Sequence, residues 1–356
     1  MSQAEGNGGA GARFLAEVRE QPAALRRLLE HDAEIARIAS AIGERDLRLI
    51  RMVGHGSSDN AASYGIYAFG LLPRRTAMRD SITLSVHYGT PVDMSGSAVI
   101  GLSQSGRTPD VVEYVKGARA AGAFTVAITN DPSSELAGEA ETTIPLAAEP
   151  EQAVAATKTY LNTLAALALL AGHLAGRGAE LADGIRRTSE LIEGAIPGLE
   201  RSTAKLALPF SYTGRMFVIG RGVEFSTARE IALKLLETCR VAAEPLTATD
   251  LAHGPVAALD PLFPVWAIAS NDGTLDTVQE AATRTREMGA TLVASGTAAE
   301  RIKGAAYTVP VPSPDPALLS PLVSVVPGQL FAGALARARG LDPDAPHGLA
   351  KVTLVN

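Results

Sequence analysis

The sequence has little cysteine, few aromatic residues and no excess of basic residues. Its 356 residues include one cysteine, 4% aromatic residues, and 32 lysine and arginine residues against 38 aspartate and glutamate residues, for a net charge of −6. One cysteine excludes an intrachain disulfide and a zinc site built from several cysteines. No run of basic residues longer than a pair marks a nucleic-acid surface. The composition favours a reduced, cytoplasmic protein that acts on a small molecule and does not bind nucleic acid.

Signals for secretion and for the membrane are also missing. The first residues, MSQAEGNGGAGA, lack the basic and apolar regions of a secretory signal and predict a disordered tail. The longest strongly apolar stretch, residues 164–171, is far shorter than the roughly 18 residues that span a bilayer. We therefore expect no membrane segment. At about 150 residues per domain, the length suggests two domains, each with its own core.

Short runs rich in valine and isoleucine alternate with longer runs at helical spacing. This alternation is typical of βαβ units, so we predict an α/β fold with parallel sheets flanked by helices, as in flavodoxin-like or Rossmann-like three-layer sandwiches. The predicted strands are residues 49–53, 98–102, 124–129, 216–219, 265–269 and 291–294.

Two segments of the first half recur in the second. MVGHGSSDNAA aligns with VIGRGVEFSTA, and VIGLSQSGRTPDVVEYVKGARAAGA aligns with WAIASNDGTLDTVQEAATRTREMGA. Gly54 and Gly106 thereby recur as Gly220 and Gly273, at offsets of 166 and 167 residues. Glycines shared at a nearly constant offset indicate an internal duplication, with the boundary in the polar stretch at residues 198–205.

The segment SQSGRT, residues 103–108, lies between a predicted strand and a predicted helix. Free N–H groups at a helix N-terminus, several hydroxyls and a flexible Gly106 can cradle a phosphate. Simple N-capping by Ser105 or Thr108 would explain one hydroxyl, and both interpretations stay open. In the duplicate, Asp272 replaces Ser105 and would repel phosphate, so we expect only the first half to bind it.

Two other motifs fail on inspection. Gly54-x-Gly56 is followed by Asp59 where a dinucleotide fingerprint needs glycine or alanine. The hydrolase elbow G-x-S-x-G would need glycine at position 105, which is serine. A nicotinamide cofactor and a serine hydrolase are therefore unsupported.

Glu230, Lys234 and Glu237 recur at i, i+4 and i+7 in AREIALKLLETCR and share one helix face. Such a pattern forms either a solvated ion pair or a carboxylate base beside an ammonium that stabilises a developing enolate. His253, before a Gly-Pro break, could move protons at neutral pH or lie half-buried in a turn. Lys351 is either a solvated tail lysine or a Schiff-base amine.

Several of these segments together resemble a known family. GHGSSDN, SQSGRT, EQAVAATKTYLNT, REIALKLLE, LAHGP and the final LAK are similar to the tandem sugar isomerase (SIS) domains of the glucosamine-6-phosphate synthases, the glutamine-fructose-6-phosphate aminotransferases. VREQPAALR resembles their entry helix. The resemblance implies a tail and entry helix at 1–30, SIS domains at 31–198 and 199–340, and a catalytic C-terminal tail at 341–356.

The resemblance also implies individual roles. Glu237 matches the carboxylate that moves a proton between carbons 1 and 2, and Lys234 the cation beside it. His253 matches the ring-opening histidine, which comes from the neighbouring subunit, and Lys351 the lysine that forms a Schiff base with the ketose. The sugar-phosphate pocket is implied for Ser58, Ser103, Gln104, Ser105 and Thr108, with a backbone contact from Val154.

Departures from the synthases bear on the reaction. The synthases carry a glutaminase domain whose first cysteine releases ammonia, whereas the one cysteine here is Cys239, so we expect no ammonia source. The run Arg107-Thr108-Pro109 resembles the stand-alone deaminases. The expected activity is a homodimeric glucosamine-6-phosphate deaminase that needs no metal or organic cofactor. The alternatives are a fructosamine-6-phosphate deglycase, a free-ammonia synthase and a non-enzymatic sugar-phosphate sensor.

Overall fold

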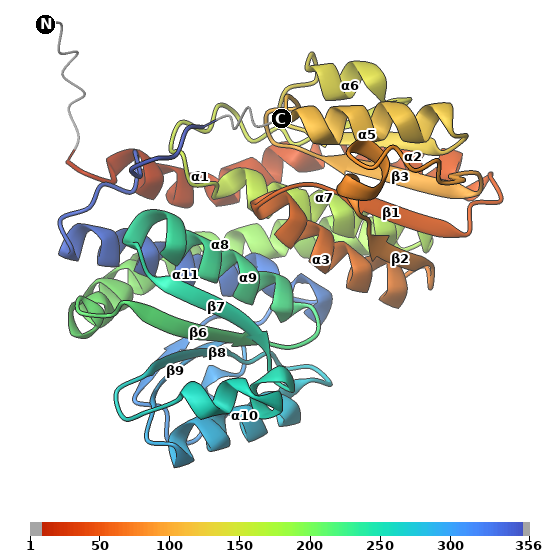
Figure 1. Ribbon diagram of the computed structural model, residues 1–356. Coiled ribbons are helices and arrows are strands. Elements are labelled where there is room, and N and C mark those ends of the chain that lie inside the picture. Colours follow the sequence, from red (N-terminus) through yellow and green to blue (C-terminus); the bar gives the residue numbers. More distant parts are fainter. Residues whose placement is uncertain (1–8, 352–356) are drawn as a thin grey trace, which may run out of the picture.

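Two parallel five-stranded sheets organise the protein, shown in Figure 1 as a computed structural model that describes residues 9–351. The first has the order β2-β1-β3-β4-β5 and the second the order β7-β6-β8-β9-β10. The two orders are equivalent, as the duplication predicts, and the α/β fold is confirmed. The strands are β1 (Leu49–Val53), β2 (Thr76–Arg79), β3 (Ser97–Leu102), β4 (Phe124–Thr129), β5 (Thr142–Pro145), β6 (Arg215–Gly220), β7 (Ala242–Thr247), β8 (Pro264–Ile268), β9 (Thr291–Gly296) and β10 (Tyr307–Pro310).

Helices cover both faces of each sheet. Figure 1 shows α5 and α6 above the first sheet, α10 below the second, and a thick helical layer between the sheets. Every residue of β3, β4 and β8 is buried, as expected for central parallel strands. The α-helices are α1 (Ala12–Leu29), α2 (Asp32–Gly43), α3 (Ser57–Leu71), α4 (Ile82–Val86), α5 (Pro109–Ala120), α6 (Glu135–Glu139), α7 (Lys158–Leu174), α8 (Gly178–Ala207), α9 (Glu224–Cys239), α10 (Leu275–Glu287) and α11 (Ser320–Ala338).

The two halves share their largest core. One cluster of buried side chains includes Met52 from β1, Trp266 from β8 and Phe331 from α11, and smaller clusters lie on the outer face of each sheet. Short 3-10 helices complete the chain: η1 (Leu208–Phe210), η2 (Asp250–His253), η3 (Pro255–Ala258), η4 (Ala299–Arg301) and η5 (Ala317–Leu319). Because the central layer belongs to both halves, side chains from the second half can reach a site on the first sheet.

Three sequence-based expectations concern the ends and the middle of the chain. The predicted entry helix is α1. Residues 198–205 lie inside α8, where a polar exposed face alternates with buried residues such as Leu199 and Thr203. Most of the predicted disordered tail falls on residues 1–8, and the last five residues of the C-terminal tail are 352–356; both lie outside the described part.

The sequence analysis did not identify one long apolar helix. Within residues 9–351, Ala317–Ala338 is the one helix long and apolar enough to cross a membrane, with a mean hydropathy of 1.6. Of the most apolar window, 94% is buried inside the protein, where α11 packs against α8 and α9. A Cβ on Gly328 would lie 2.3 Å from Ile231 Cγ1, so glycine lets α9 approach closely. Burial in the core accounts for this helix.

Candidate active site

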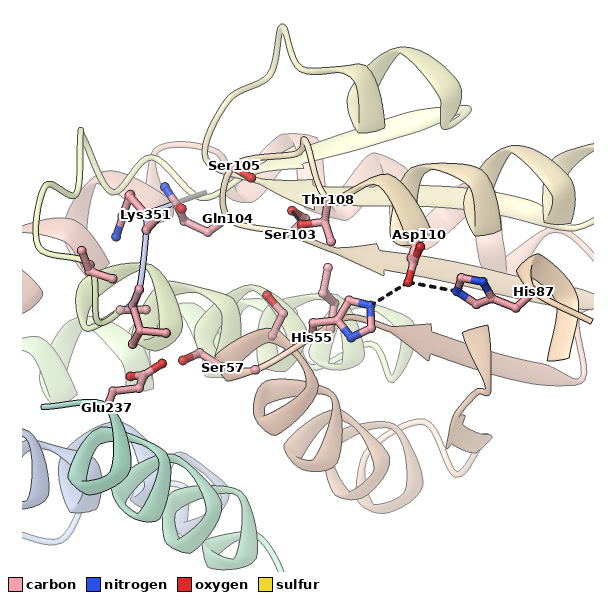
Figure 2. Close-up of a pocket in the computed structure, with 17 residues that line it drawn as sticks. His55, Ser57, His87, Ser103, Gln104, Ser105, Thr108, Asp110, Glu237 and Lys351 are labelled. Carbon is pink, nitrogen blue, oxygen red and sulfur yellow. Dashed lines mark hydrogen bonds and ion pairs between the residues drawn. The ribbon is translucent and has the colours of Figure 1, made fainter. Parts of the chain in front are cut away.

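A cavity of about 480 Å³ opens at the carboxyl ends of β1 and β3. This is the point where the strand order reverses, which is where open α/β sheets bind their ligands. The first half supplies the turn after β1, the loop after β3 and the loop before α7, while α9 and the C-terminal tail complete the cavity (Figure 2). Of the predicted site residues, those that line it are Ser58, Ser103, Gln104, Ser105, Thr108, Val154, Glu237 and Lys351.

The loop after β3 presents its hydroxyls to this cavity. Ser103 Oγ accepts a hydrogen bond from Gly106 N at 3.1 Å and lies 3.0 Å from Thr108 Oγ1. Gly106 has φ +63°, and a Cβ there would collide with Ser134 Oγ at 2.0 Å, so only glycine fits the turn. Within the described chain no side-chain hydrogen bond caps α5, which removes N-capping as the reason for these hydroxyls. The α5 N-terminus and its hydroxyls suit an anion.

Arg107 does not take part in this arrangement. Its Nη2 atom lies 3.2 Å from Asp131 Oδ2, its side chain is largely exposed, and it lines a neighbouring cavity instead. The cradle after β3 is therefore built from hydroxyls and backbone, without the charge of Arg107.

The charged face of α9 is buried rather than solvated. Lys234 Nζ lies 2.6 Å from Glu237 Oε2 and 3.3 Å from Glu230 Oε1, and the side chains of Lys234 and Glu230 are fully buried. Burial alone would lower the pKa of Lys234, but the charges of Glu230 and Glu237 outweigh it and raise that pKa. The solvated ion pair is therefore the wrong interpretation of this spacing.

Hydrogen bonds from α3 fix the inner end of this charged group. Ser57 Oγ donates to Glu230 Oε1 at 2.9 Å, and Asn60 Nδ2 donates to Glu230 Oε2 at 2.8 Å. Burial raises the pKa of Glu230, and Lys234 and Asn60 oppose the rise. Because Glu230 is enclosed, Glu237, whose side chain is 22% exposed, is the carboxylate on this face of α9 that reaches the cavity. A carboxylate held beside an ammonium is the arrangement needed to move a proton on a bound ligand.

Lys351 is also held in place rather than solvated. Its Nζ lies 2.8 Å from Glu151 Oε2 and 2.7 Å from the carbonyl oxygen of Ala153. Burial would raise the pKa of Glu151, but the charge and hydrogen bond of Lys351 outweigh it, and the pKa is lowered. Figure 2 shows Lys351 and Glu237 on the same side of the cavity. The nearby Val154 N–H donates to the carbonyl of Asp344 at 3.4 Å.

One predicted catalytic residue lies elsewhere in the described chain. His253 is exposed at the end of η2 and does not line the cavity. The same cavity instead contains His55 and His87, whose Nε2 atoms lie 3.7 and 3.4 Å from Asp110 Oδ2. The sequence analysis missed these groups, although His55 belongs to the GHGSSDN segment and Asp110 lies two residues after SQSGRT. Among residues 9–351, no group of three histidine, cysteine, aspartate or glutamate side chains is placed to hold a metal ion.

In the second half, the position equivalent to Ser58 of the sugar-phosphate pocket is occupied by a carboxylate. Glu224, aligned with Ser58, is buried and accepts hydrogen bonds from Ser270 Oγ, from Ser324 Oγ at 2.8 Å and from Thr227 Oγ1 at 2.6 Å. Burial raises the pKa of Glu224 despite these donors. The remaining cavity beside Ser270 is about 130 Å³. This geometry supports the prediction that only the first half binds phosphate.

Comparisons with known proteins agree with this arrangement. The SIS domain family model matches residues 46–172 and 210–338. The chain is 36% identical to a glutamine–fructose-6-phosphate aminotransferase (isomerizing) from Gloeobacter violaceus, over 96% of this chain and 58% of that protein, so it spans less than two thirds of this relative. The C-terminal domain of a glucosamine-fructose-6-phosphate aminotransferase from Francisella tularensis superposes with a TM-score of 0.87 at 25% identity, over 96% of this chain and 100% of that one. A glucosamine-6-phosphate deaminase from Thermotoga maritima superposes with a TM-score of 0.77 at 22% identity over the same shares, a likeness of fold alone.

Proposed function

The chain belongs to the SIS domain family, and we propose that it is a sugar-phosphate isomerase that deaminates glucosamine-6-phosphate to fructose-6-phosphate and ammonia. The observation that carries this proposal is that both halves of the chain line one cavity. In it, the hydroxyl cradle after β3 faces the Glu237 carboxylate of α9. A phosphate bound by the cradle would extend its sugar toward Glu237. The Arg107-Thr108-Pro109 run, which resembles the deaminases, favours release of ammonia over its incorporation.

The site residues divide the reaction among themselves. His253 of a second copy opens the pyranose ring, which exposes the aldehyde at carbon 1. Glu237 takes the proton from carbon 2 and returns it to carbon 1, while Lys234 stabilises the charge that builds up between the two steps. Water then adds to the ketimine at carbon 2, and the carbon–nitrogen bond breaks to release ammonia and the ketose. The aldehyde accepts the electron pair, so the proton transfer requires no cofactor.

Part of this proposal concerns assembly and location. The resemblance assigns the ring-opening step to a neighbouring subunit, and the exposed position of His253 is compatible with that arrangement. We therefore propose a homodimer with two-fold symmetry, in which His253 of each copy contributes to the active site of the other. From the composition of the sequence, we also propose that the protein is cytoplasmic.

The test is an assay of the purified protein with glucosamine-6-phosphate. We expect ammonia and fructose-6-phosphate in equal amounts, and none from glucosamine, which cannot occupy the phosphate cradle. Binding of glucosamine-6-phosphate without release of either product would overturn the deaminase assignment and favour a sugar-phosphate sensor.

A second candidate, the fructosamine-6-phosphate deglycase, is favoured by a separate observation. A cavity of about 530 Å³ lies on the other side of Glu237, lined by Leu236, Arg240 and Leu341, and it shares Glu237 and Leu349 with the first cavity. Ammonia needs little of this space, whereas an amine that carries a carboxylate could fill it and meet Arg240. Release of glucose-6-phosphate from a fructosamine 6-phosphate, with no ammonia from glucosamine-6-phosphate, would select this candidate.

Ser105→Asp is expected to weaken sugar-phosphate binding strongly. The new carboxylate would face the phosphate inside the cradle, and juxtaposed like charges cost several kcal/mol, so the KM should rise on the order of a hundredfold. Arg107→Ala is the control, because Arg107 pairs with Asp131 outside the cavity. Unchanged saturation of Ser105→Asp by glucosamine-6-phosphate would show that the phosphate binds elsewhere.

A further inference from the structure

The contacts of α1 point to an unassigned part for one of its side chains. We propose that Glu17 is a positioning residue that holds the loop at residues 151–154, and through it the seat of Lys351. The seat consists of the Glu151 carboxylate and the Ala153 carbonyl, which both accept hydrogen bonds from Lys351 Nζ. The inference rests on the proposed function, because Lys351, which matches the lysine that forms a Schiff base with the ketose, matters to turnover only if the site is catalytic.

Glu17 contacts this loop through its backbone. The side chain is buried, at 6% exposure, and its Oε1 accepts a hydrogen bond from Gln152 N. Ala153 N lies 3.3 Å from each carboxylate oxygen of Glu17. Ala153, whose carbonyl accepts a hydrogen bond from Lys351, is therefore fixed at its own N–H by a residue 136 positions away in the chain.

The same helix also holds the segment that leads to Lys351. Asp344 of the tail caps the first turn of α1, with its Oδ1 2.7 Å from Phe14 N and its Oδ2 3.1 Å from Arg13 N. The Asp344 carbonyl in turn accepts the hydrogen bond from Val154 N. The loop and the tail that meet at Lys351 both bind to α1. The contact with the loop, through Glu17, is the buried one of the two.

The charges around Glu17 make this contact sensitive to pH. Burial is the main cause that raises the pKa of Glu17 to about 7; the charge of Glu151 adds to the rise, and the two backbone N–H groups and Lys351 oppose it. An ionised carboxylate is the stronger acceptor for those N–H groups, so the seat is held most firmly above neutral pH. Charged groups near Glu17 on α1 and α7 pair with other residues: Lys158 with Glu20, Arg27 with Glu20, and Arg19 with Glu200.

Glu17→Gln tests the proposal with little change in shape. We expect kcat at pH 8 to fall on the order of tenfold, because a hydrogen bond to a charged acceptor is replaced by a weaker neutral one. KM should change less than kcat, since the phosphate cradle lies on a different loop. The wild-type kcat profile should show an acid limb near pH 7 that the variant lacks. Glu200→Gln, in the exposed pair with Arg19, is the matched control and should resemble the wild type.

Hydrogen exchange separates failure of this inference from failure of the proposed function. Once corrected for intrinsic rates, exchange of the Gln152 and Ala153 amides should accelerate in the wild type as pH falls from 8 to 6, and should stay constant in Glu17→Gln. This readout needs no substrate and no turnover. Equal, pH-independent exchange in both proteins, or an unchanged acid limb in the variant, would overturn the role of Glu17 whichever substrate the protein turns over.

Discussion

Replacing Glu237 by glutamine is expected to lower kcat for glucosamine-6-phosphate by about 10²- to 10⁴-fold, the range of a lost general acid–base group. Glutamine has nearly the same shape but cannot take a proton from carbon 2. Of the three charged groups on this face of α9, Glu237 is the one that lines the cavity, so Glu230 cannot replace it from its enclosed position. The loss should be in kcat, and the KM and the thermal shift caused by the sugar phosphate should change little.

The comparison needs a carboxylate that does not touch the site. Glu280→Gln, on the exposed surface of α10, makes the same chemical change far from the cavity and should keep full activity. If Glu237→Gln turned over at the wild-type rate, the proton would have to move through another group, and Lys351 would be the next candidate on that side of the cavity. If it lost binding as well as turnover, Glu237 would serve to hold the sugar rather than to move its protons.

Local sequence patterns identified the three central strands of each sheet, but not the edge strands β2, β5, β7 and β10. All six predicted strands are present, and their limits differ by at most two residues from the observed ones, as with residues 265–269 against β8 at Pro264–Ile268. Buried parallel strands produce continuous apolar runs, and glycine turns at their ends mark the switch to a helix. The duplicated glycines likewise indicated two equivalent sheets, which share one strand order.

Contacts between distant segments could not be predicted in this way. Spacing placed Glu230, Lys234 and Glu237 on one face, but whether that face meets solvent depends on α3, which supplies Ser57 and Asn60 from about 170 residues earlier. In the second half, Glu224 occupies the position equivalent to Ser58. It is held there partly by a hydrogen bond from Ser324 of α11, which lies 100 residues later in the chain. The pairing of His55 and His87 with Asp110 joins two loops and the first turn of α5. These groups are individually ordinary in sequence, and tertiary packing decides what they do.

Burial of the α9 charges also predicts the largest effect on stability. Lys234→Met should lower the free energy of unfolding by about 3–5 kcal/mol at pH 8, because it leaves Glu230 fully buried without its cation. The pKa of Glu230 is already raised by burial, and losing Lys234 removes a charge that opposes the rise. A carboxyl whose folded-state pKa lies above its unfolded value destabilises the fold as it ionises, so the deficit should shrink as pH falls from 8 toward 5. Urea denaturation at several pH values measures this.

The double variant Lys234→Met with Glu230→Gln shows whether the buried charge is the cause. Glutamine keeps an acceptor for Ser57 and removes the uncompensated charge, so most of the lost stability should return at pH 8, and the pH dependence should flatten. A double variant as unstable as Lys234→Met would attribute the loss to packing of the methionine side chain instead. A loss below about 1 kcal/mol in the single variant would place the pair among exposed ion pairs, contrary to the enclosure seen for both side chains. Lys234 also forms an ion pair with Glu237. Turnover should therefore stay low in the double variant, even where its stability returns.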